Sequence, residues 1–336
     1  MDPTYCKVIT PMFLAGGQEK VENNRVQKVP EFRAPSIRGA LRWWFRAVAG
    51  GYVNLSELKR LEGCLFGDPD KAGASSLVVR VWAAAFDKEA MAFMLPHKQG
   101  NQRANTRCIP VGTCFKVTLQ ESAYDPAPDA LKTAKTLFNL SATLGGLGRR
   151  SRRGFGAFQP TDWKFENTGA VKEHVEAKVE AARKVVKAFI DAHPPATVPT
   201  FAANAVADYP ILHPNVANIR VGEARGWDSF IKALMTATHD FLKPPQFCLN
   251  ITDKKKQEQC IKAERKKAER VLGSGVPRQA STLIVSVVEV KGGQIVPIYT
   301  QFYCKTQNRF RNRTDFDEIK DLPAKVSSSL LSVAIP

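Results

Sequence analysis

Residues 145–156 read GGLGRRSRRGFG and hold five glycines, four arginines and no acidic residue. Glycine lets backbone N–H groups turn toward a ligand, and the arginine guanidinium group is a permanently charged donor that matches phosphate oxygens. The stretch therefore predicts a solvent-facing binding loop for a polyanion. The alternative is a solvated loop that owes its glycines to a tight turn. The predicted contacts within it are Gly146, Gly148, Arg149, Arg150, Arg152, Arg153 and Phe155.

The segments on either side of this loop predict the fold of the first half of the chain. Apolar residues recur at helical spacing over 129–144, and a short strand is expected at 155–158. Upstream, we expect a strand at 5–13 and then a polar loop to residue 30. Helices at 35–49 and 56–65 follow, and then strands at 75–86 and 112–120. The order strand, helix, strand, strand, helix, strand is that of the split β-α-β, ferredoxin-like unit.

A second unit is expected from Trp163 onward. Apolar spacing predicts helices at 171–190, 227–242 and 253–272, a strand within 209–221, and a last helix after Asp315. Two strands, 281–290 and 295–303, flank the hairpin signal Lys291-Gly292-Gly293. The fold class is therefore α+β, divided into residues 1–162 and residues 163–336. No exact internal repeat is visible, and the second unit fits a decayed copy of the first.

Composition indicates the class of partner. The chain of 336 residues carries 49 Lys and Arg against 32 Asp and Glu, which gives a net charge of +17. An excess this large suits a polyanion, and nucleic acid is the commonest one. Neither end of the sequence shows the long amphipathic lysine helix that would favour binding to a membrane surface. The seven cysteines form no C-x-x-C pair, so we expect neither a disulfide framework nor a zinc site. This cysteine usage fits a cytoplasmic location.

The helix expected at 35–49 carries a second basic feature. Arg38, Arg42 and Arg46 recur every fourth residue beside the apolar stripe, and Trp43 points to the polar side. Arginine and an aromatic ring together form a platform on which splayed bases stack. The alternative is that Trp43 covers a domain interface while the arginines pair with carboxylates.

Catalytic chemistry has little support in the sequence. Of five histidines, His97 in the basic loop 96–110 is the best candidate for a general base, and no known phosphate-loop or hydrolase motif is present. No cofactor is expected. The lysine-rich stretch 253–272 is interleaved with Glu258, Glu264 and Glu269, which favours a salt-bridged, solvated face.

Four motifs, in order and spacing, resemble one known family. They are 9–14 (ITPMFL), 33–44 (RAPSIRGALRWW), 65–67 (LFG) and 147–156 (LGRRSRRGFG). Together they resemble the first subunits of the Cmr effector complex of type III-B CRISPR systems, within the RAMP superfamily. The resemblance implies two ferredoxin-like domains with the glycine-rich loop beside the cleft between them, and it adds Arg33 to the expected RNA contacts.

The same resemblance implies a function. It predicts a non-catalytic RNA-binding subunit of an antiviral ribonucleoprotein, which engages guide RNA near its 3′ end and helps to capture target RNA. Other RAMP subunits would be its partners. The alternative function is a metal-independent endoribonuclease of the same superfamily that processes guide RNA with a histidine such as His97.

Overall fold

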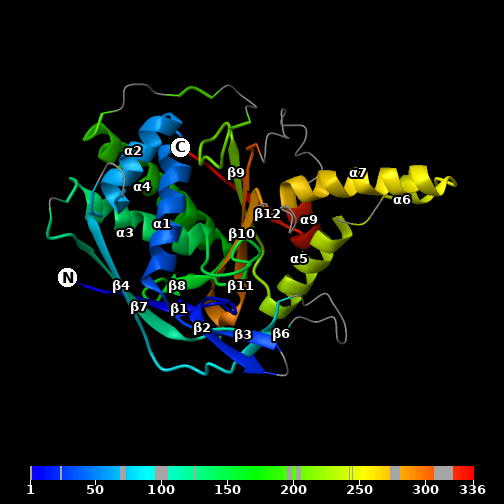
Figure 1. The fold of residues 1–336 in the computed structure, drawn as a ribbon, viewed down its shortest axis with the longest axis horizontal. Helices are drawn as coiled ribbons and strands as arrows, with labels where there is room; N and C mark the ends of the chain where they lie inside the picture. Colours follow the sequence, from blue (N-terminus) through cyan, green and yellow to red (C-terminus); the bar gives the residue numbers. More distant parts are fainter. Residues whose placement is uncertain are drawn as a thin grey trace.

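Two four-stranded antiparallel sheets form the frame of the chain in a computed structural model (Figure 1). The structure describes residues 2–22, 25–68, 73–94, 105–124, 126–194, 199–201, 206–241, 243, 245–272, 281–305 and 321–336. The coarse prediction of an α+β fold is confirmed. Helices α1, α3 and α4 lie between the two sheets and contribute to a hydrophobic core that includes residues of both.

The first sheet has the neighbour order β4-β7-β1-β8. Its strands are β1 (Thr4–Val8), β4 (Leu77–Ala83), β7 (Cys114–Glu121) and β8 (Phe158–Pro160). Helices α1 (Ala34–Ala49) and α2 (Leu55–Phe66) follow β1, and α3 (Ala130–Leu144) joins β7 to β8. The predicted order of strands and helices is therefore present, although β1 ends five residues earlier than the strand expected at 5–13.

Two small hairpins extend the first unit. The first pairs β2 (Ala15–Glu22) with β3 (Arg25–Pro30), and the second pairs β5 (Met91–Phe93) with β6 (Asn105–Arg107). The prediction of a polar loop up to residue 30 was wrong. Charged residues interrupt the sequences of β2 and β3, and Glu19 pairs with Lys28 across the hairpin, so the segment lacks the apolar alternation by which a strand is recognised.

The second sheet has the neighbour order β10-β11-β9-β12. Its strands are β9 (Ala217–Gly222), β10 (Leu283–Glu289), β11 (Ile295–Phe302) and β12 (Leu330–Val333). The 3-10 turn η2 (Lys291–Gly293) closes the predicted hairpin. Helix α5 (Trp227–Phe241) follows β9, and α9 (Leu322–Val326) precedes β12, a strand that the sequence did not predict. Both sheets thus place their strands in the order second, third, first, fourth.

Helix α4 (Thr168–Asp191) links the two units. The Asn167 side chain caps it by accepting a hydrogen bond of 3.0 Å from the Ala170 N–H. Its valines at positions 171, 175, 179 and 186 are buried, and it packs against α3, α1 and β9. The amphipathic pattern predicted for 171–190 is confirmed. None of the helices in the described ranges is long and apolar enough to cross a bilayer.

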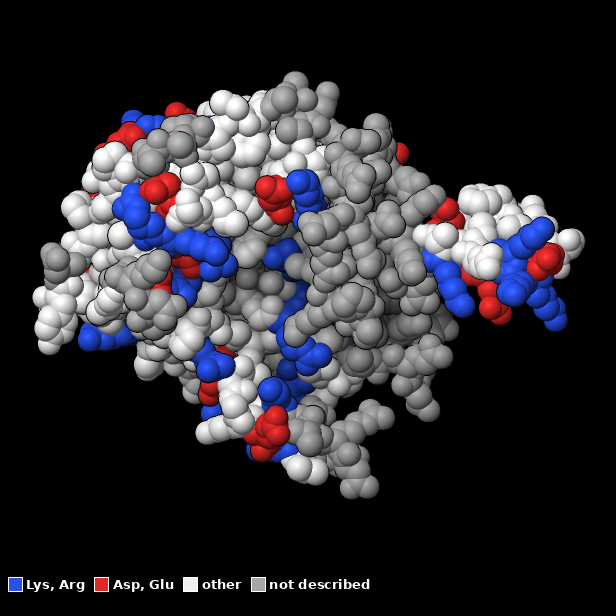
Figure 2. Space-filling model, turned by 45° about the horizontal axis from the view of Figure 1, so that its top comes forward, with Lys and Arg blue, Asp and Glu red and all other residues white. Residues whose placement is uncertain are grey.

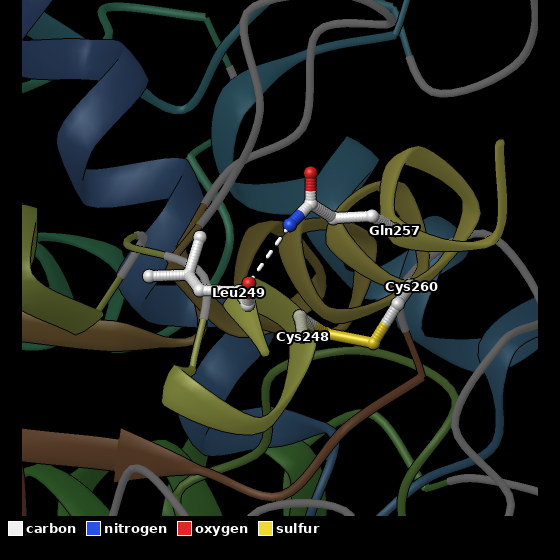
Figure 3. The surroundings of a disulfide bond; sticks show 4 residues. All are labelled: Cys248, Leu249, Gln257 and Cys260. Atoms are coloured by element: carbon white, nitrogen blue, oxygen red, sulfur yellow. Dashed lines mark hydrogen bonds between the residues drawn. A yellow bond between two sulfur atoms is a disulfide. The ribbon is translucent and has the colours of Figure 1, made fainter. Parts of the chain in front are cut away.

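Helices α6 (Gln246–Leu249) and α7 (Lys254–Leu272) extend away from the sheets (Figure 1). A disulfide bond between Cys248 and Cys260 joins them, and the Gln257 side chain donates a 2.9 Å hydrogen bond to the Leu249 carbonyl (Figure 3). The expectation of no disulfide framework was therefore wrong for this one pair. It rested on the absence of closely spaced cysteines, whereas these two are separated by 12 positions and meet because the chain reverses between the helices.

Candidate nucleic-acid interface

The glycine-arginine loop, residues 145–156, runs between the two units. The Arg149 N–H donates to the Phe13 carbonyl at 2.9 Å, which ties the loop to the segment after β1. On its other side, the Gly154 N–H donates to the Val285 carbonyl at 2.8 Å, and the Val285 N–H donates to the Arg152 carbonyl at 3.2 Å. These hydrogen bonds attach the loop to β10. The loop is therefore packed between two sheets, and the prediction of a solvent-facing loop holds only in part, since Gly148 and Arg149 are exposed while residues 154–156 are buried.

Two of its glycines are required by backbone contacts inside the protein. Gly148 has a φ of +87°, and a Cβ atom at this position would lie 2.6 Å from the Phe13 carbonyl oxygen. Gly156 has a φ of +68°, and its Cβ would lie 1.9 Å from the Leu147 carbonyl oxygen. Side chains are disfavoured at positive φ and also by such close approach. These glycines thus allow close packing, whether or not a ligand is bound.

The four loop arginines differ in their surroundings. Arg149 is exposed, whereas the other three are partly buried and reach residues of the second unit. Arg152 Nη1 donates to the Ser281 carbonyl at 2.6 Å, and Arg150 Nη1 lies 3.5 Å from the Met235 sulfur. Arg153 Nη1 donates to Ser281 Oγ at 3.1 Å. Among the ion pairs between described residues, none involves Arg149, Arg150 or Arg152.

Burial and mutual repulsion act on this arginine cluster. Burial, together with the charges of Arg150 and Arg152, lowers the pKa of Arg153 to about 10. Burial is also the largest cause of the lowered pKa values of Arg150 and Arg152. All three guanidinium groups stay charged at neutral pH, so the loop concentrates positive charge. An anion bound beside them would relieve the repulsion.

Trp43 lies where α1 meets the second sheet. Its ring makes edge contacts with Trp44 at 4.7 Å and with Phe302 of β11 at 5.7 Å between centroids. The Arg152 guanidinium lies over the same ring, 5.1 Å from its centroid. The structure therefore agrees with the alternative in which Trp43 covers an interface, and the cation–π contact couples this ring to the loop.

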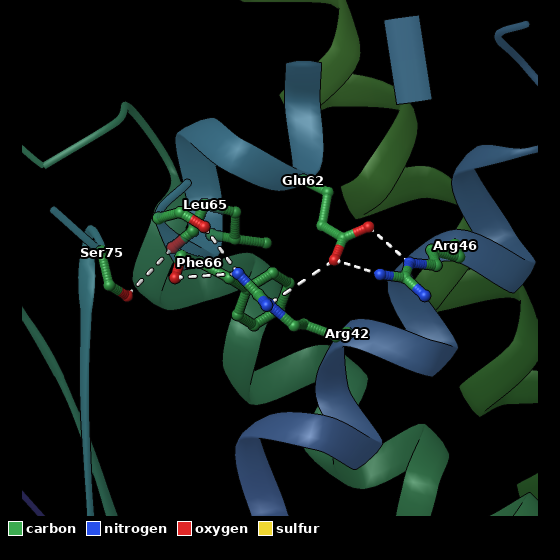
Figure 4. Close-up of polar contacts among 7 residues, drawn as sticks. Arg42, Arg46, Glu62, Leu65, Phe66 and Ser75 are labelled. Atoms are coloured by element: carbon green, nitrogen blue, oxygen red, sulfur yellow. Dashed lines mark hydrogen bonds and ion pairs between the residues drawn. The ribbon is translucent and has the colours of Figure 1, made fainter. Parts of the chain in front are cut away.

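The arginine stripe of α1 faces α2 and β4. Arg42 Nη2 donates to the Gly67 carbonyl at 2.6 Å, at the C-terminal end of α2, where helix carbonyls lack partners (Figure 4). Arg46 makes a two-pronged contact with the buried carboxylate of Glu62, and Arg38 Nη2 donates to the Leu77 carbonyl at 3.0 Å. The alternative that these arginines pair with carboxylates holds for Arg42 and Arg46. Their contacts hold α2 on α1.

A cavity of about 250 Å³ opens between α1, the loop and β10. The residues lining it include Ser36, Ala40 and Trp43 from α1, Gly146, Gly148, Ser151 and Arg152 from the loop, and Ile284 from β10. Within the described part of the chain, the backbone N–H groups of Gly146, Gly148 and Ser151 donate no hydrogen bond. The cavity thus combines an arginine, an indole ring and nearby free amide donors, a set suited to an anion that carries a ring.

One face of the molecule carries a run of basic side chains (Figure 2). Figure 2 shows Lys and Arg side chains following one another down a hollow near the middle of the face drawn. A groove lined by one sign of charge concentrates its field and attracts a polyanion. This agrees with the excess of basic residues in the sequence.

The structure brings together only part of the predicted site. Trp43, Gly146, Gly148 and Arg152 line one cavity. Arg33 is exposed at the start of α1 and lies 3.2 Å from the Glu31 carboxylate. Phe155 is only 2% exposed and packs against Phe13 and Trp227, so its ring offers no face to a base.

Sequence reasoning missed Ser36, Ala40, Ser151 and Ile284 as lining residues. For α1 the signal was present: Ser36, Ala40 and Trp43 follow the i, i+4, i+7 spacing of one helical face. Ile284 comes from the other unit, so only the tertiary arrangement reveals it.

The histidines that the structure describes do not gather at this cavity. Within the described ranges none lines it, and His97 lies outside them. His174 packs between Trp163 and Phe165, and burial lowers its pKa to about 4. Among the described residues, no group of three or more His, Cys, Asp or Glu is placed to hold a metal ion.

Comparison with known proteins relates the chain to one family. Residues 5–159 match the family model of the RAMP superfamily. The CRISPR system Cmr subunit Cmr1-1 of Pyrococcus furiosus is 31% identical over 144 residues, which are 40% of this chain and 41% of that protein. Subunit Cmr1-2 of the same organism is 29% identical over 184 residues, 46% of this chain and 91% of that protein. The match thus spans about two fifths of the length of Cmr1-1.

Solved structures share the fold over nearly the whole chain. The apo crystal structure of Cmr1 from Pyrococcus furiosus superposes with a TM-score of 0.60, covering 98% of this chain and 97% of that one at 17% identity. A chain in the cryo-EM structure of the type III-B Cmr-beta bound to cognate target RNA gives a TM-score of 0.55, covering 96% and 99% at 11% identity.

Proposed function

Residues 5–159 of this chain belong to the RAMP superfamily, and on that premise we propose that the chain is a non-catalytic RNA-binding subunit of a type III-B CRISPR ribonucleoprotein. The similarity to Cmr1 subunits and the fold shared with a Cmr-beta chain support this assignment. In that role the chain engages guide RNA near its 3′ end, helps to capture target RNA, and contacts other RAMP subunits in the cytoplasm.

The strand order supports the domain assignment within this proposal. Each sheet is built from a strand-helix-strand-strand-helix-strand segment with the neighbour order second, third, first, fourth. We assign both to the ferredoxin-like class, with helical insertions, and divide them at residues 162 and 163. The glycine-arginine loop then lies at the junction of the two domains, where both contribute to the cavity.

The observation that carries the RNA assignment is the arginine cluster beside this cavity. Arg149, Arg150 and Arg152 enter no ion pair within the described ranges, and their charges lie beside free backbone N–H groups. Arg149 is exposed and can reach a phosphate, while Arg152 stacks on Trp43 at the cavity wall. Phosphate oxygens would accept hydrogen bonds from these donors, and a base would contact the indole ring.

In this proposal the residues predicted to contact RNA have two roles. Arg33, Trp43, Gly146, Gly148, Arg149, Arg150, Arg152 and Arg153 form or support the RNA-binding surface. Arg42 and Arg46 position α2 through the Gly67 carbonyl and Glu62, whereas Arg38 contacts the Leu77 carbonyl of β4. Phe155 supports the loop from within the core.

The test is the salt dependence of RNA affinity, measured by fluorescence anisotropy with a labelled single-stranded RNA. Each phosphate contact contributes about −0.7 to the slope of log affinity against log salt concentration. We expect Arg149→Ala to weaken binding at low salt and to flatten the slope by about 0.7. Lys184→Ala, which removes one exposed charge from α4, is the control and should leave the slope unchanged. A slope near zero for the wild-type protein would contradict the proposal.

A second measurement separates binding from cleavage. Guide precursor and target RNA are incubated with the protein in EDTA and analysed on denaturing gels. We expect intact RNA, because no histidine in the described ranges lines the cavity. Specific cleavage would instead support the endoribonuclease function.

A further inference from the structure

The first sheet has one buried face and one open face. Along β1, β4 and β7, residues such as Cys6, Val79 and Phe115 point toward α1 and α3 and are buried. The alternate residues point the other way, since successive side chains of a strand lie on opposite faces. Tyr5 of β1 and Trp82 of β4 are among them and are 56% and 59% exposed.

Register places these two aromatic residues in one row. Tyr5 pairs with Lys116 of β7, and Lys116 pairs in turn with Trp82, so the three lie side by side across three strands. Lys116 Nζ lies 5.1 Å from the centroid of the Trp82 ring. Neighbouring strands are about 4.8 Å apart, which puts the backbones of Tyr5 and Trp82 about 10 Å from each other. The row therefore offers two separate rings with a cation between them.

The open face is basic as well as aromatic. Its outward positions on the three strands are Tyr5, Lys7, Val78, Arg80, Trp82, Cys114, Lys116, Thr118 and Gln120. Three of these are cations and none is acidic. Lys7 pairs with Glu289 of β10, whereas Arg80 is exposed on the edge strand. The charge of this face is thus complementary to a polyanion.

We propose that this open sheet face is a second RNA-binding surface, on which bases stack on Tyr5 and Trp82 while Lys116 and Arg80 contact phosphates. The inference rests on the proposed function in that RNA is its ligand, but it uses residues outside the glycine-arginine loop. Exposed aromatic rings stack on any base, so such a surface can bind RNA strands of different sequence. A face for a protein partner would instead present a contiguous apolar patch, whereas here Lys116 separates the two rings and polar Thr118 and Gln120 continue the same row of β7.

The proposal is tested with the full-length protein and a labelled single-stranded RNA. We expect the double variant Tyr5→Ala, Trp82→Ala to bind about tenfold more weakly or worse, and Tyr5→Phe, Trp82→Phe to bind like wild type, because stacking needs only the rings. Tyr124→Ala is the matched control: Tyr124 is 82% exposed and lies outside the sheet, so its loss should leave affinity unchanged. Thermal melting checks that each variant is folded.

The outcomes separate this inference from the proposed function. Weaker binding by both the sheet variant and Arg149→Ala supports both. If Arg149→Ala weakens binding while the sheet variant equals Tyr124→Ala, the sheet surface is overturned and the loop site stands. If only the sheet variant weakens binding, the sheet surface stands and the loop site is overturned. Wild-type protein that binds no RNA overturns both, and a sheet variant that binds RNA normally but loses a protein partner assigns this face to protein docking.

Discussion

Replacing Gly148 by alanine tests whether the glycine-arginine loop is a packed element of the fold. The added Cβ meets two obstacles. The φ of +87° is left-handed, which costs a non-glycine residue about 1–2 kcal/mol. The Cβ would also lie 2.6 Å from the Phe13 carbonyl oxygen, the acceptor of the Arg149 N–H. Relieving that overlap stretches a hydrogen bond worth about 1 kcal/mol.

Together these effects predict that Gly148→Ala lowers the free energy of unfolding by about 2–3 kcal/mol. For a chain of 336 residues, that corresponds to a fall in melting temperature of roughly 3–4 °C. Differential scanning calorimetry and urea unfolding measure both quantities. Because the substitution leaves net charge unchanged, any loss of RNA affinity at temperatures where the variant is folded reports on loop geometry.

Two other glycines serve as matched controls for the same chemical change. Gly112 has a φ of +85° but open space around its Cβ position, so Gly112→Ala carries only the backbone cost of about 1–2 kcal/mol. Gly39 lies in α1 with open space and no left-handed φ, so Gly39→Ala should stabilise the protein by about 0.5–1 kcal/mol. If Gly148→Ala is no more destabilising than Gly112→Ala, the argument from loop packing is refuted.

Three further predictions follow from other parts of the structure. Glu62→Gln should lower the free energy of unfolding by about 1–2 kcal/mol, because Arg42 and Arg46 lose their buried counter-charge. Glu166→Gln, which removes an exposed pair with Lys291, should lower it far less, and equal losses for the two variants in urea unfolding would count against this prediction. The pKa of His174 is lowered from 6.5 to about 4, so between these pH values the unfolded chain binds a proton at His174 that the folded chain does not bind. Stability should therefore fall by up to about 3 kcal/mol as the pH drops from 7 to 4, and His174→Phe should remove that part of the pH dependence. Thiol titration in guanidinium without reductant should find five reactive cysteines, and seven after reduction; seven in both would exclude the bond between Cys248 and Cys260 in the purified protein.

Elements with regular apolar spacing were predicted well from the sequence. Helices α1, α3 and α4 begin and end within three residues of the predicted bounds, because each has a continuous apolar stripe. The resemblance to the RAMP superfamily, drawn from motifs in the first 160 residues, is confirmed by the family match. Elements without that spacing were missed, namely the polar hairpin of β2 and β3, the hairpin of β5 and β6, whose second strand lies in the predicted loop 96–110, and the short strand β12.

The site was harder to predict than the fold, because it depends on which partner each arginine finds. Arg38, Arg42, Arg150 and Arg152 are all basic residues in basic stretches, and nothing local distinguishes them. The structure separates them by position: Arg42 meets the carbonyls that end α2, whereas Arg152 meets the ring of Trp43 and the Ser281 carbonyl of the second unit. These contacts join residues far apart in sequence, which local patterns do not encode.

The most direct test of the central claim is photo-crosslinking of the full-length protein to single-stranded RNA that carries 4-thiouridine, followed by mass spectrometry of the crosslinked peptides. The proposed interface predicts crosslinks within two segments that meet at the cavity, residues 36–43 of α1 and residues 145–152 of the loop. Their yield should fall in Arg149→Ala and remain unchanged in Lys184→Ala. Efficient crosslinking of the RNA elsewhere on the protein, with none in either segment, would contradict the assignment of this cavity as the RNA-binding site.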